Sequence, residues 1–262
     1  MPKAYEEIAD DIRRSIREAE RGPGEQLPSE TELAKTYRRS VPTVQNALRL
    51  LVAEGLIDKQ HGRGTFVRRP RTPAVRDNRR HQWEKDRARQ SFVRRAETGA
   101  TEHDTGLEPN DLVFHAKYCE IRASRELAQA FGVPEGTALV ERTYRTRHTA
   151  ETAPFSLVTS RLVRDMIAAN PDLLDDSKEP WPGGTQHQLH TVGIEVGRIE
   201  ERFTARPPTP EEAKQLELPT GTSVILLHKT SYDTQDRVVD ITDVTLPGDR
   251  TELCFTTRLE RW

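Results

Sequence analysis

The sequence predicts an α+β protein of two domains. Residues 4–67 contain three helical patterns followed by one hairpin pattern, whereas strands and short helices alternate from about residue 100 onward. A basic segment with two prolines separates these two parts. A chain of 262 residues is long enough for two domains with separate cores.

Composition excludes several classes of protein. Hydrophobic residues make up 34% and charged residues 31% of the chain, which is typical of a soluble globular protein. No apolar run approaches the roughly 20 residues of a membrane span, and the N-terminus lacks the apolar core of a secretory signal. We therefore expect a cytoplasmic protein that does not bind a membrane. Cys119 and Cys254 are expected to be buried thiols rather than a disulfide.

The charge is unevenly distributed. Residues 1–80 hold 17 Lys and Arg against 12 Asp and Glu, whereas the remaining 182 residues hold 23 against 30. A basic first part next to an acidic remainder indicates that the first part meets a polyanion.

The first two helices are predicted from apolar spacing and a capping motif. The spacing of three or four residues that defines one apolar stripe is found at Tyr5, Ile8, Ile12 and Ile16. The segment GPGEQLP then breaks the chain. Ser29 and Glu32 form a capping box that opens the second helix, which buries Leu33, Ala34 and Tyr37.

A third helix is predicted from Ser40, a good N-cap, to Gly55. At about 100° per residue, one face of this helix is apolar and consists of Val41, Val44, Leu48, Leu51 and Val52. The opposite face carries Pro42, Gln45, Asn46 and Arg49. The strand-like segments LIDKQ and TFVRR then flank HGRG, which predicts a β-hairpin with a glycine-rich tip.

Three helices, a tight turn between the second and third, and a trailing hairpin predict a winged helix-turn-helix. Arg63 at the hairpin tip has no core to pack into. Its flanking glycines let the backbone approach a phosphate strand or a narrow groove, where the negative potential attracts arginine. The alternative is a tight turn with a solvated charge, but the three preceding helices favour the DNA-binding interpretation.

Three motifs carry a resemblance to a known family: LPSE at the second helix, S-x-x-T-V at the third, and GRGTFV in the hairpin. Residues 4–67 resemble the DNA-binding domain of the GntR family of bacterial transcription regulators. The resemblance implies a homodimer that binds a short pseudo-palindrome in double-stranded DNA, with the third helix in the major groove and the wing beside it. By position it implies DNA contacts from Thr31, Ser40, Val41, Pro42, Thr43, Gln45, His61, Gly62, Arg63 and Gly64.

The sequence departs from the family pattern at two of these positions. Val41 and Gln45 stand where the family usually has arginine. Arginine reads guanine, whereas glutamine suits adenine and valine can only touch a thymine methyl group. The operator is therefore expected to differ from that of a typical member. Arg38 and Arg39 are expected to contact phosphates, and Asn46 and Arg49 either contact DNA or form a solvated helix face.

Residues 68–95 hold 11 Lys and Arg against 3 Asp and Glu, and no apolar period runs through their first half. We interpret residues 70–95 as a linker between a DNA-binding domain at 1–69 and a second domain at 96–262. The linker either contacts phosphates or is a solvated tether that packs only at Trp83 and Phe92.

An internal repeat marks the second domain. Ala128-x-x-Phe131-x-Val133-Pro134-x-Gly136-Thr137 recurs 85 residues later as Ala213-x-x-Leu216-x-Leu218-Pro219-x-Gly221-Thr222. Each copy predicts a short helix, a turn and a long strand, and the two copies are expected to be related by a pseudo-two-fold. Further strands are predicted at 114–123, 155–163, 198–206 and 237–246, and further helical turns at 185–192.

This second part resembles the UTRA effector-binding domain of the HutC-type branch of the GntR regulators, an antiparallel sheet with helices of the chorismate-lyase type. In strand 138–147, Arg142 shares a face with apolar residues, so it either snorkels at a sheet edge or faces an anion pocket. The resemblance favours the pocket. It implies effector contacts from Arg142, Tyr144, Ser156, Glu201 and Asp240. The family often has a second arginine where Tyr144 stands, which argues against a phosphorylated effector.

We therefore expect a repressor that binds DNA as a dimer and responds to a small metabolite. The alternative is a DNA-binding scaffold that responds to a protein partner. No catalytic triad, metal triad or phosphate loop indicates an enzyme or a cofactor, and the His187 and His190 pair lacks a third metal ligand at a matching spacing. The protein is expected in the cytoplasm and, when bound to DNA, at the nucleoid.

Overall fold

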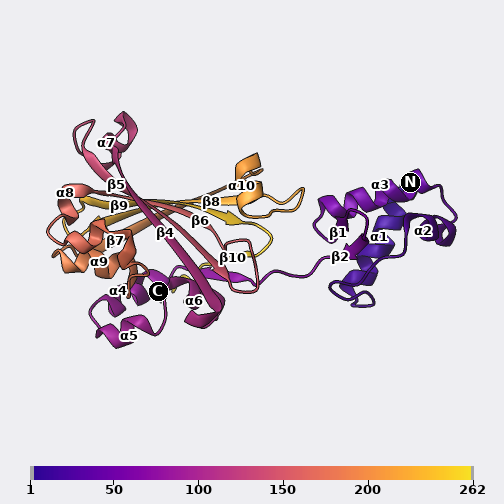
Figure 1. Cartoon of the computed structure of the whole chain (residues 1–262), viewed down its shortest axis with the longest axis horizontal. Coiled ribbons are helices and arrows are strands. Elements are labelled where there is room, and N and C mark those ends of the chain that lie inside the picture. Colours follow the sequence, from indigo (N-terminus) through magenta and orange to yellow (C-terminus); the bar gives the residue numbers. More distant parts are fainter. Residues whose placement is uncertain (1–2, 261–262) are drawn as a thin grey trace. The chain divides into compact units, whose positions relative to one another are not determined.

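The computed structural model describes residues 3–260, which divide into two compact units (Figure 1). The first unit runs to Arg71 and also includes Pro207–Ser223. The second comprises Thr72–Arg206 and the chain from Val224 onward. The first unit contains the predicted helices and hairpin, and the second contains the sheet.

In the first unit, α2 and α3 begin directly after their predicted capping residues. The elements of this unit are α1 (Ala4–Arg17), α2 (Glu30–Tyr37), α3 (Val41–Ala53), β1 (Ile57–Gln60), β2 (Gly64–Val67) and α10 (Pro210–Gln215). The Ser29 hydroxyl accepts a hydrogen bond from the Glu32 N–H, and the Glu32 carboxylate accepts one from the Ser29 N–H at 2.8 Å. Ser40 caps α3. None of the helices in residues 3–260 has the length and hydropathy that crossing a bilayer demands.

The first unit has one apolar core. Its fully buried members come from all three helices and the hairpin and include Ile8, Ile12, Leu33, Val44, Leu48, Leu51, Ile57 and Val67. The prediction for Val41 was wrong: it is half-buried and lies outside this cluster, because it is the first residue of α3, and Ala47 is buried instead. Burial of each large apolar side chain stabilises the unit by about 1.5–3 kcal/mol.

The second unit contains a six-stranded antiparallel sheet in the order β4-β5-β6-β9-β8-β7. The strands are β4 (Leu112–Arg122), β5 (Ala138–His148), β6 (Leu157–Val163), β7 (Val196–Arg206), β8 (Val224–Asp233) and β9 (Val238–Pro247). Each half of the sheet is built from three consecutive strands, and the halves join where β6 pairs with β9.

The internal repeat of the sequence is reproduced in the backbone. In the first copy the Val133 N–H donates to the Ala128 carbonyl at 2.9 Å, and in the second the Leu218 N–H donates to the Ala213 carbonyl at 2.8 Å. Gly136 and Gly221 have positive φ values of 81° and 86°, which favour glycine. Each copy therefore ends a helix and starts a long strand in the same way.

Helices cover both faces of the sheet. On one face, α7 (Arg125–Phe131) packs Phe131 against Leu139 and Ile241. On the other, Val140 and Leu162 pack against segments that include α8 (Arg164–Ile167), the 3₁₀ helix η2 (Pro171–Leu174) and α9 (Gly184–Thr191). Short 3₁₀ turns also occur at η1 (Pro109–Asp111) and η3 (Asp176–Lys178).

Residues 70–95 differ from the predicted linker because most of them are folded. They contain β3 (Ala74–Asp77), α4 (Arg80–Ala88) and most of α5 (Phe92–Ala96), and α6 (Ala100–Thr105) follows. Strand β3 pairs in parallel with β10 (Thr251–Cys254) near the end of the chain. Trp83 lies against the Arg87 guanidinium and the His103 ring, whereas Phe92 is 63% exposed and does not pack as predicted.

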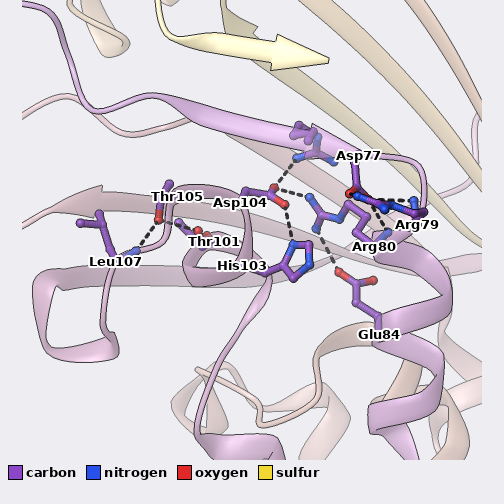
Figure 2. A network of polar contacts seen from close by, with 10 residues as sticks. Asp77, Arg79, Arg80, Glu84, Thr101, His103, Asp104, Thr105 and Leu107 are labelled. Carbon is purple, nitrogen blue, oxygen red and sulfur yellow. Dashed lines mark hydrogen bonds and ion pairs between the residues drawn. The ribbon is translucent and has the colours of Figure 1, made fainter. Parts of the chain in front are cut away.

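Buried ion pairs hold this segment together (Figure 2). The Arg80 guanidinium contacts Asp104 of α6 and, at 3.0 Å, Glu84 of its own helix. Arg76 lies 3.7 Å from the same Asp104 carboxylate. The Asp77 carboxylate accepts a hydrogen bond from the backbone N–H of Arg80, the first residue of α4, at 3.0 Å. Charge pairing, which no hydrophobic pattern reveals, therefore orders this segment.

Both cysteines are free thiols, as expected, but the prediction that both are buried was wrong. Cys254 is half-buried, whereas Cys119 is exposed. Cys119 lies on the edge strand β4 and points to the face opposite its half-buried neighbour Tyr118, where its side chain is exposed.

We predict that replacing Asp104 with alanine destabilises the second unit by about 3–5 kcal/mol, because Arg80 and Arg76 lose their shared buried counter-charge. Chemical denaturation followed by the fluorescence of Trp83 and Trp181, both in this unit, measures the effect. The matched control is Asp165→Ala: its side chain is 87% exposed, and the change is expected to stay within about 0.5 kcal/mol. Equal effects of the two changes would contradict the role of the buried pairs.

Candidate functional site

The polar surface of the first unit is formed by the start of α2, the outer face of α3 and the tip of the β1–β2 hairpin. Most of the predicted DNA-contacting residues are exposed there: Thr31, Arg38, Arg39, Ser40, Pro42, Asn46, Arg49, His61, Gly62, Arg63 and Gly64. Val41, Thr43 and Gln45 are half-buried. Most of these predicted residues are therefore exposed, and hydrogen bonds of Glu30 connect the start of α2 to α3 and to β1.

The hairpin tip has the backbone geometry that its glycines permit. Gly62 and Gly64 have φ values of 72° and 120°, in the region that favours glycine. The Gln26 amide donates a hydrogen bond to the Arg63 carbonyl at 3.0 Å and thereby holds the backbone of the tip. The Arg63 side chain remains exposed. The tip can therefore present a guanidinium without disturbing the core.

A carboxylate that the sequence analysis missed lies within this surface. Glu30, the first residue of α2, accepts a hydrogen bond from the Gln45 amide at 2.7 Å and lies 2.6 Å from the Lys59 ammonium. The hydrogen bond from Lys59, followed by that from Gln45, lowers the pKa of Glu30, and the positive charge of Lys59 lowers it further. Glu30 is the last residue of the LPSE motif, but only the folded arrangement brings it to Gln45.

Two of the predicted DNA-contacting arginines, Arg39 and Arg49, have partners within the first unit. Arg39 lies 3.7 Å from Glu7, an exposed pair that contributes little stability and leaves Arg39 free to exchange partners. Arg49 donates to the Asn46 side chain on the outer face of α3. An α-helix of this width fits the major groove of DNA, which is about 12 Å wide.

A second candidate site lies on the sheet of the second unit. In directly paired positions, one polar residue from each of the six strands forms a continuous row: Tyr118, Arg142, Ser160, Thr242, Lys229 and Glu201. Paired residues point to the same face, and α9 contributes Gln188 to it. Arg142 and Glu201 were predicted from the sequence, whereas the other four follow only from the strand register.

Arg142 is the most buried charge in this row, with no exposed surface. Its guanidinium donates to the Gln188 side-chain oxygen at 2.8 Å and to the Leu173 carbonyl at 2.6 Å, and it lies over the Tyr118 ring. Its Nε has no hydrogen-bond partner. The snorkelling alternative is therefore wrong, because the side chain is held inside by neutral oxygen atoms.

A carboxylate lies one step further along this network. Glu179 accepts hydrogen bonds from the hydroxyls of Tyr118 and Tyr144 and, at 2.9 Å, from the Gln188 amide. Gln188 therefore connects Arg142 to Glu179. Burial raises the pKa of the Tyr144 phenol well above its usual value, and the Glu179 charge raises it further. Tyr144 consequently remains a neutral donor.

Asp240, also predicted as an effector contact, has internal partners. It is fully buried and accepts hydrogen bonds from Ser160 at 2.6 Å and from Ser231 and Thr242. Lys229 lies 3.2 Å from it. A ligand that reached Asp240 would have to compete with these partners. Its carboxylate therefore stabilises the polar row through its contacts with Ser160, Thr242 and Lys229.

Glu201 connects the row to α4. Its carboxylate lies 3.1 Å from the His81 imidazole. Burial raises the pKa of Glu201, but the contact with His81 and the charges of Arg76 and Lys229 outweigh burial and lower it. Ser156, the last predicted effector residue, is half-buried in the segment before β6 and lies outside the paired register.

Comparisons with known proteins agree with this architecture. The family model described as bacterial regulatory proteins, gntR family, matches residues 4–67, and the UTRA domain model matches residues 113–252. The second match alone spans more than half of the chain. The chain belongs to the GntR family. It combines the GntR helix-turn-helix with the UTRA domain of the HutC-type branch, which confirms the resemblance noted in the sequence.

Relatives of this GntR regulator are themselves transcriptional regulators. An HTH-type transcriptional regulator of Streptomyces coelicolor is 29% identical over 246 residues, which cover 91% of this chain and 87% of that protein. The HTH-type transcriptional repressor NagR of Bacillus subtilis is 27% identical, with 87% of this chain and 84% of NagR covered. A crystal structure of a GntR-family transcriptional regulator, 22% identical, covers 98% of both chains with a TM-score of 0.64 and confirms the fold.

The GntR regulator contains a histidine whose ionisation is expected to affect its stability. His187 of α9 accepts a hydrogen bond from the Trp181 indole at 2.7 Å. Burial, followed by the positive charge of Arg95, lowers the pKa of His187 from 6.5 to about 4. Between these values the unfolded chain binds more protons at this residue than the folded chain, so its contribution to stability decreases as the pH falls.

We predict that His187→Asn reduces the loss of thermal stability between pH 7 and pH 5, because an asparagine oxygen accepts from the indole but does not titrate. Melting temperatures of both proteins at the two pH values measure this difference. The same decrease in both proteins would show that His187 does not contribute to the pH dependence.

Proposed function

We propose that this regulator is a repressor that binds a pseudo-palindromic operator as a homodimer and releases it when a small metabolite binds to the UTRA domain. The observation that carries the effector part is Arg142, a fully buried guanidinium with neutral partners only and an unpaired Nε. A buried charge without a counter-ion is costly, and an acidic or polar group of a ligand would compensate it.

The polar row supports a small, mostly uncharged or zwitterionic effector rather than a phosphorylated one. The positive groups Arg142 and Lys229 share the face with the carboxylates of Glu179, Glu201 and Asp240. A dianionic phosphate would meet these three carboxylates. We propose that Tyr144, Ser156, Glu201 and Asp240 complete the effector site around Arg142.

The exposed outer face of α3 and the hairpin tip support operator binding by residues 1–69. Arg38 and Arg39 are proposed to contact phosphates, and Gln45 together with the hairpin tip is proposed to read the bases. Residues 96–262 would then bind the effector and form the dimer. In this role the protein would catalyse no reaction. It would act in the cytoplasm and, when bound to DNA, at the nucleoid.

The effector would act by binding more tightly to one of two arrangements of the dimer, and it can shift their populations only by that difference in affinity. An alternative partner is a protein rather than a metabolite. The exposed Phe92 and Val93 side chains of α5, 63% and 68% exposed, favour that alternative. A thermal-shift panel of sugars, sugar phosphates, amino acids and nucleotides distinguishes the two, because only a metabolite-binding domain is stabilised.

We predict that Arg63→Ala weakens operator binding about tenfold, because the exposed hairpin tip loses its guanidinium. Gel-shift titration with promoter fragments from the neighbourhood of the gene measures the affinity. The melting temperature is expected to stay unchanged, since the side chain is exposed. An unaltered affinity would remove the hairpin tip from the DNA interface.

We predict that Arg142→Met abolishes the response to any compound found in the thermal-shift panel and leaves operator affinity within about twofold of wild type. Methionine fills much of the volume but donates no hydrogen bonds. The matched control is Arg122→Met on β4, whose side chain is 71% exposed and whose response should be normal. A normal response of Arg142→Met would exclude Arg142 from the effector site.

A further inference from the structure

One carboxylate connects three elements of the proposed DNA-binding surface. Glu30 begins α2, accepts a hydrogen bond from Gln45 of α3 at 2.7 Å, and pairs with Lys59 of β1 at 2.6 Å. The Glu30 side chain is 25% exposed and that of Lys59 is 63% exposed. The carboxylate is thus partly shielded by its neighbours: Lys59 contacts its Oε1 atom and Gln45 its Oε2 atom.

The Glu30 carboxylate fixes the orientation of the Gln45 amide. An ionised carboxylate only accepts hydrogen bonds, so the amide nitrogen must face Glu30 and the amide oxygen must point away. Within residues 3–260, the Gln45 oxygen has no hydrogen-bond partner. The amide therefore offers a free acceptor oxygen and its second N–H donor to whatever approaches α3.

We propose that Glu30 determines the base specificity of this regulator by orienting Gln45 to read adenine. Adenine presents an amino donor and the N7 acceptor in the major groove, which match the free oxygen and second N–H of Gln45. Guanine presents two acceptors, O6 and N7. To donate to both, the amide would have to turn its oxygen toward the Glu30 carboxylate, which is repulsive. This inference depends on the proposed operator binding.

The same carboxylate lowers affinity for DNA of any sequence. It neutralises the Lys59 ammonium and adds a negative charge close to the phosphates. Removal of Glu30 is therefore expected to release Lys59 for a phosphate contact. Loss of specificity combined with a gain in non-specific affinity distinguishes a specificity-determining role from a structural one, because misfolding would weaken both.

The experiment is selection of bound duplexes from a random-sequence library by the full chain. Wild type should enrich adenine at one position of each half-site. In Glu30→Ala the adenine-to-guanine ratio at that position should fall about fivefold or more. Affinity for a random duplex should rise, and the salt dependence of binding should steepen by about one phosphate contact.

Two further variants control the selection. Asp58→Ala removes one negative charge next to Lys59 on β1, on the opposite side of that strand; it should raise non-specific affinity but keep the adenine preference. In a Gln45→Ala background, addition of Glu30→Ala should not alter base preference further, because Glu30 acts through Gln45. If Glu30→Ala fails to fold, Glu30→Gln replaces it, since glutamine keeps the size but lifts the constraint on the amide.

The outcomes separate the inference from the proposed function. If wild type enriches no sequence, operator binding itself is wrong, and the inference is wrong with it. If wild type enriches an operator but Glu30→Ala retains the same adenine preference, or if wild type prefers guanine at the Gln45 position, operator binding stands and the role of Glu30 is wrong.

Discussion

A fully buried guanidinium is the constraint on which the second unit depends. Arg142 has no exposed surface, so every donor that is satisfied must be satisfied from inside the domain. The segments that cover the sheet supply those acceptors: α9 provides Gln188 and η2 provides the Leu173 carbonyl. Gln188 in turn holds Glu179. The apolar cluster around Val140 attaches these segments to the sheet, but the polar contacts decide which side chains face each other.

The two units use charge in opposite ways. In the first unit the basic and polar side chains of α3 and the hairpin remain at the surface, where they cost little and can exchange water for a polyanion. In the second unit, charges such as Arg142 and Asp240 are buried, where an unpaired group is costly and each requires partners. Exposed charge suits rapid binding to many DNA sequences, whereas buried charge suits selective recognition of one small molecule.

Local sequence signals predicted the elements that depend on local interactions. The capping box at Ser29 and the repeated Pro-x-Gly turns form as expected, because each is a contact between residues a few positions apart. The segment 70–95 has the sequence of a linker but is folded, since Arg80 is ordered by Asp104, 24 residues further on. The polar row across the sheet was only partly predictable. Arg142 follows from strand alternation and Glu201 from the family resemblance, but Lys229 and Ser160 join them only through the register of six strands.

The folded residues 72–88 connect the chain that leaves the first unit to the polar row of the second. The chain that leaves the first unit enters the second at Thr72, whose hydroxyl donates to Glu151, and then passes through β3 into α4. There, His81 contacts Glu201 of the polar row, and the His81 carbonyl accepts from Gln186 of α9. Gln186 and Gln188 lie two positions apart on α9, one bound to α4 and the other to Arg142. A ligand that rearranged the partners of Arg142 would therefore alter α9 and, through it, the segment that tethers the DNA-binding unit. A flexible linker could not transmit such a change, because it has no discrete alternative arrangement to bias.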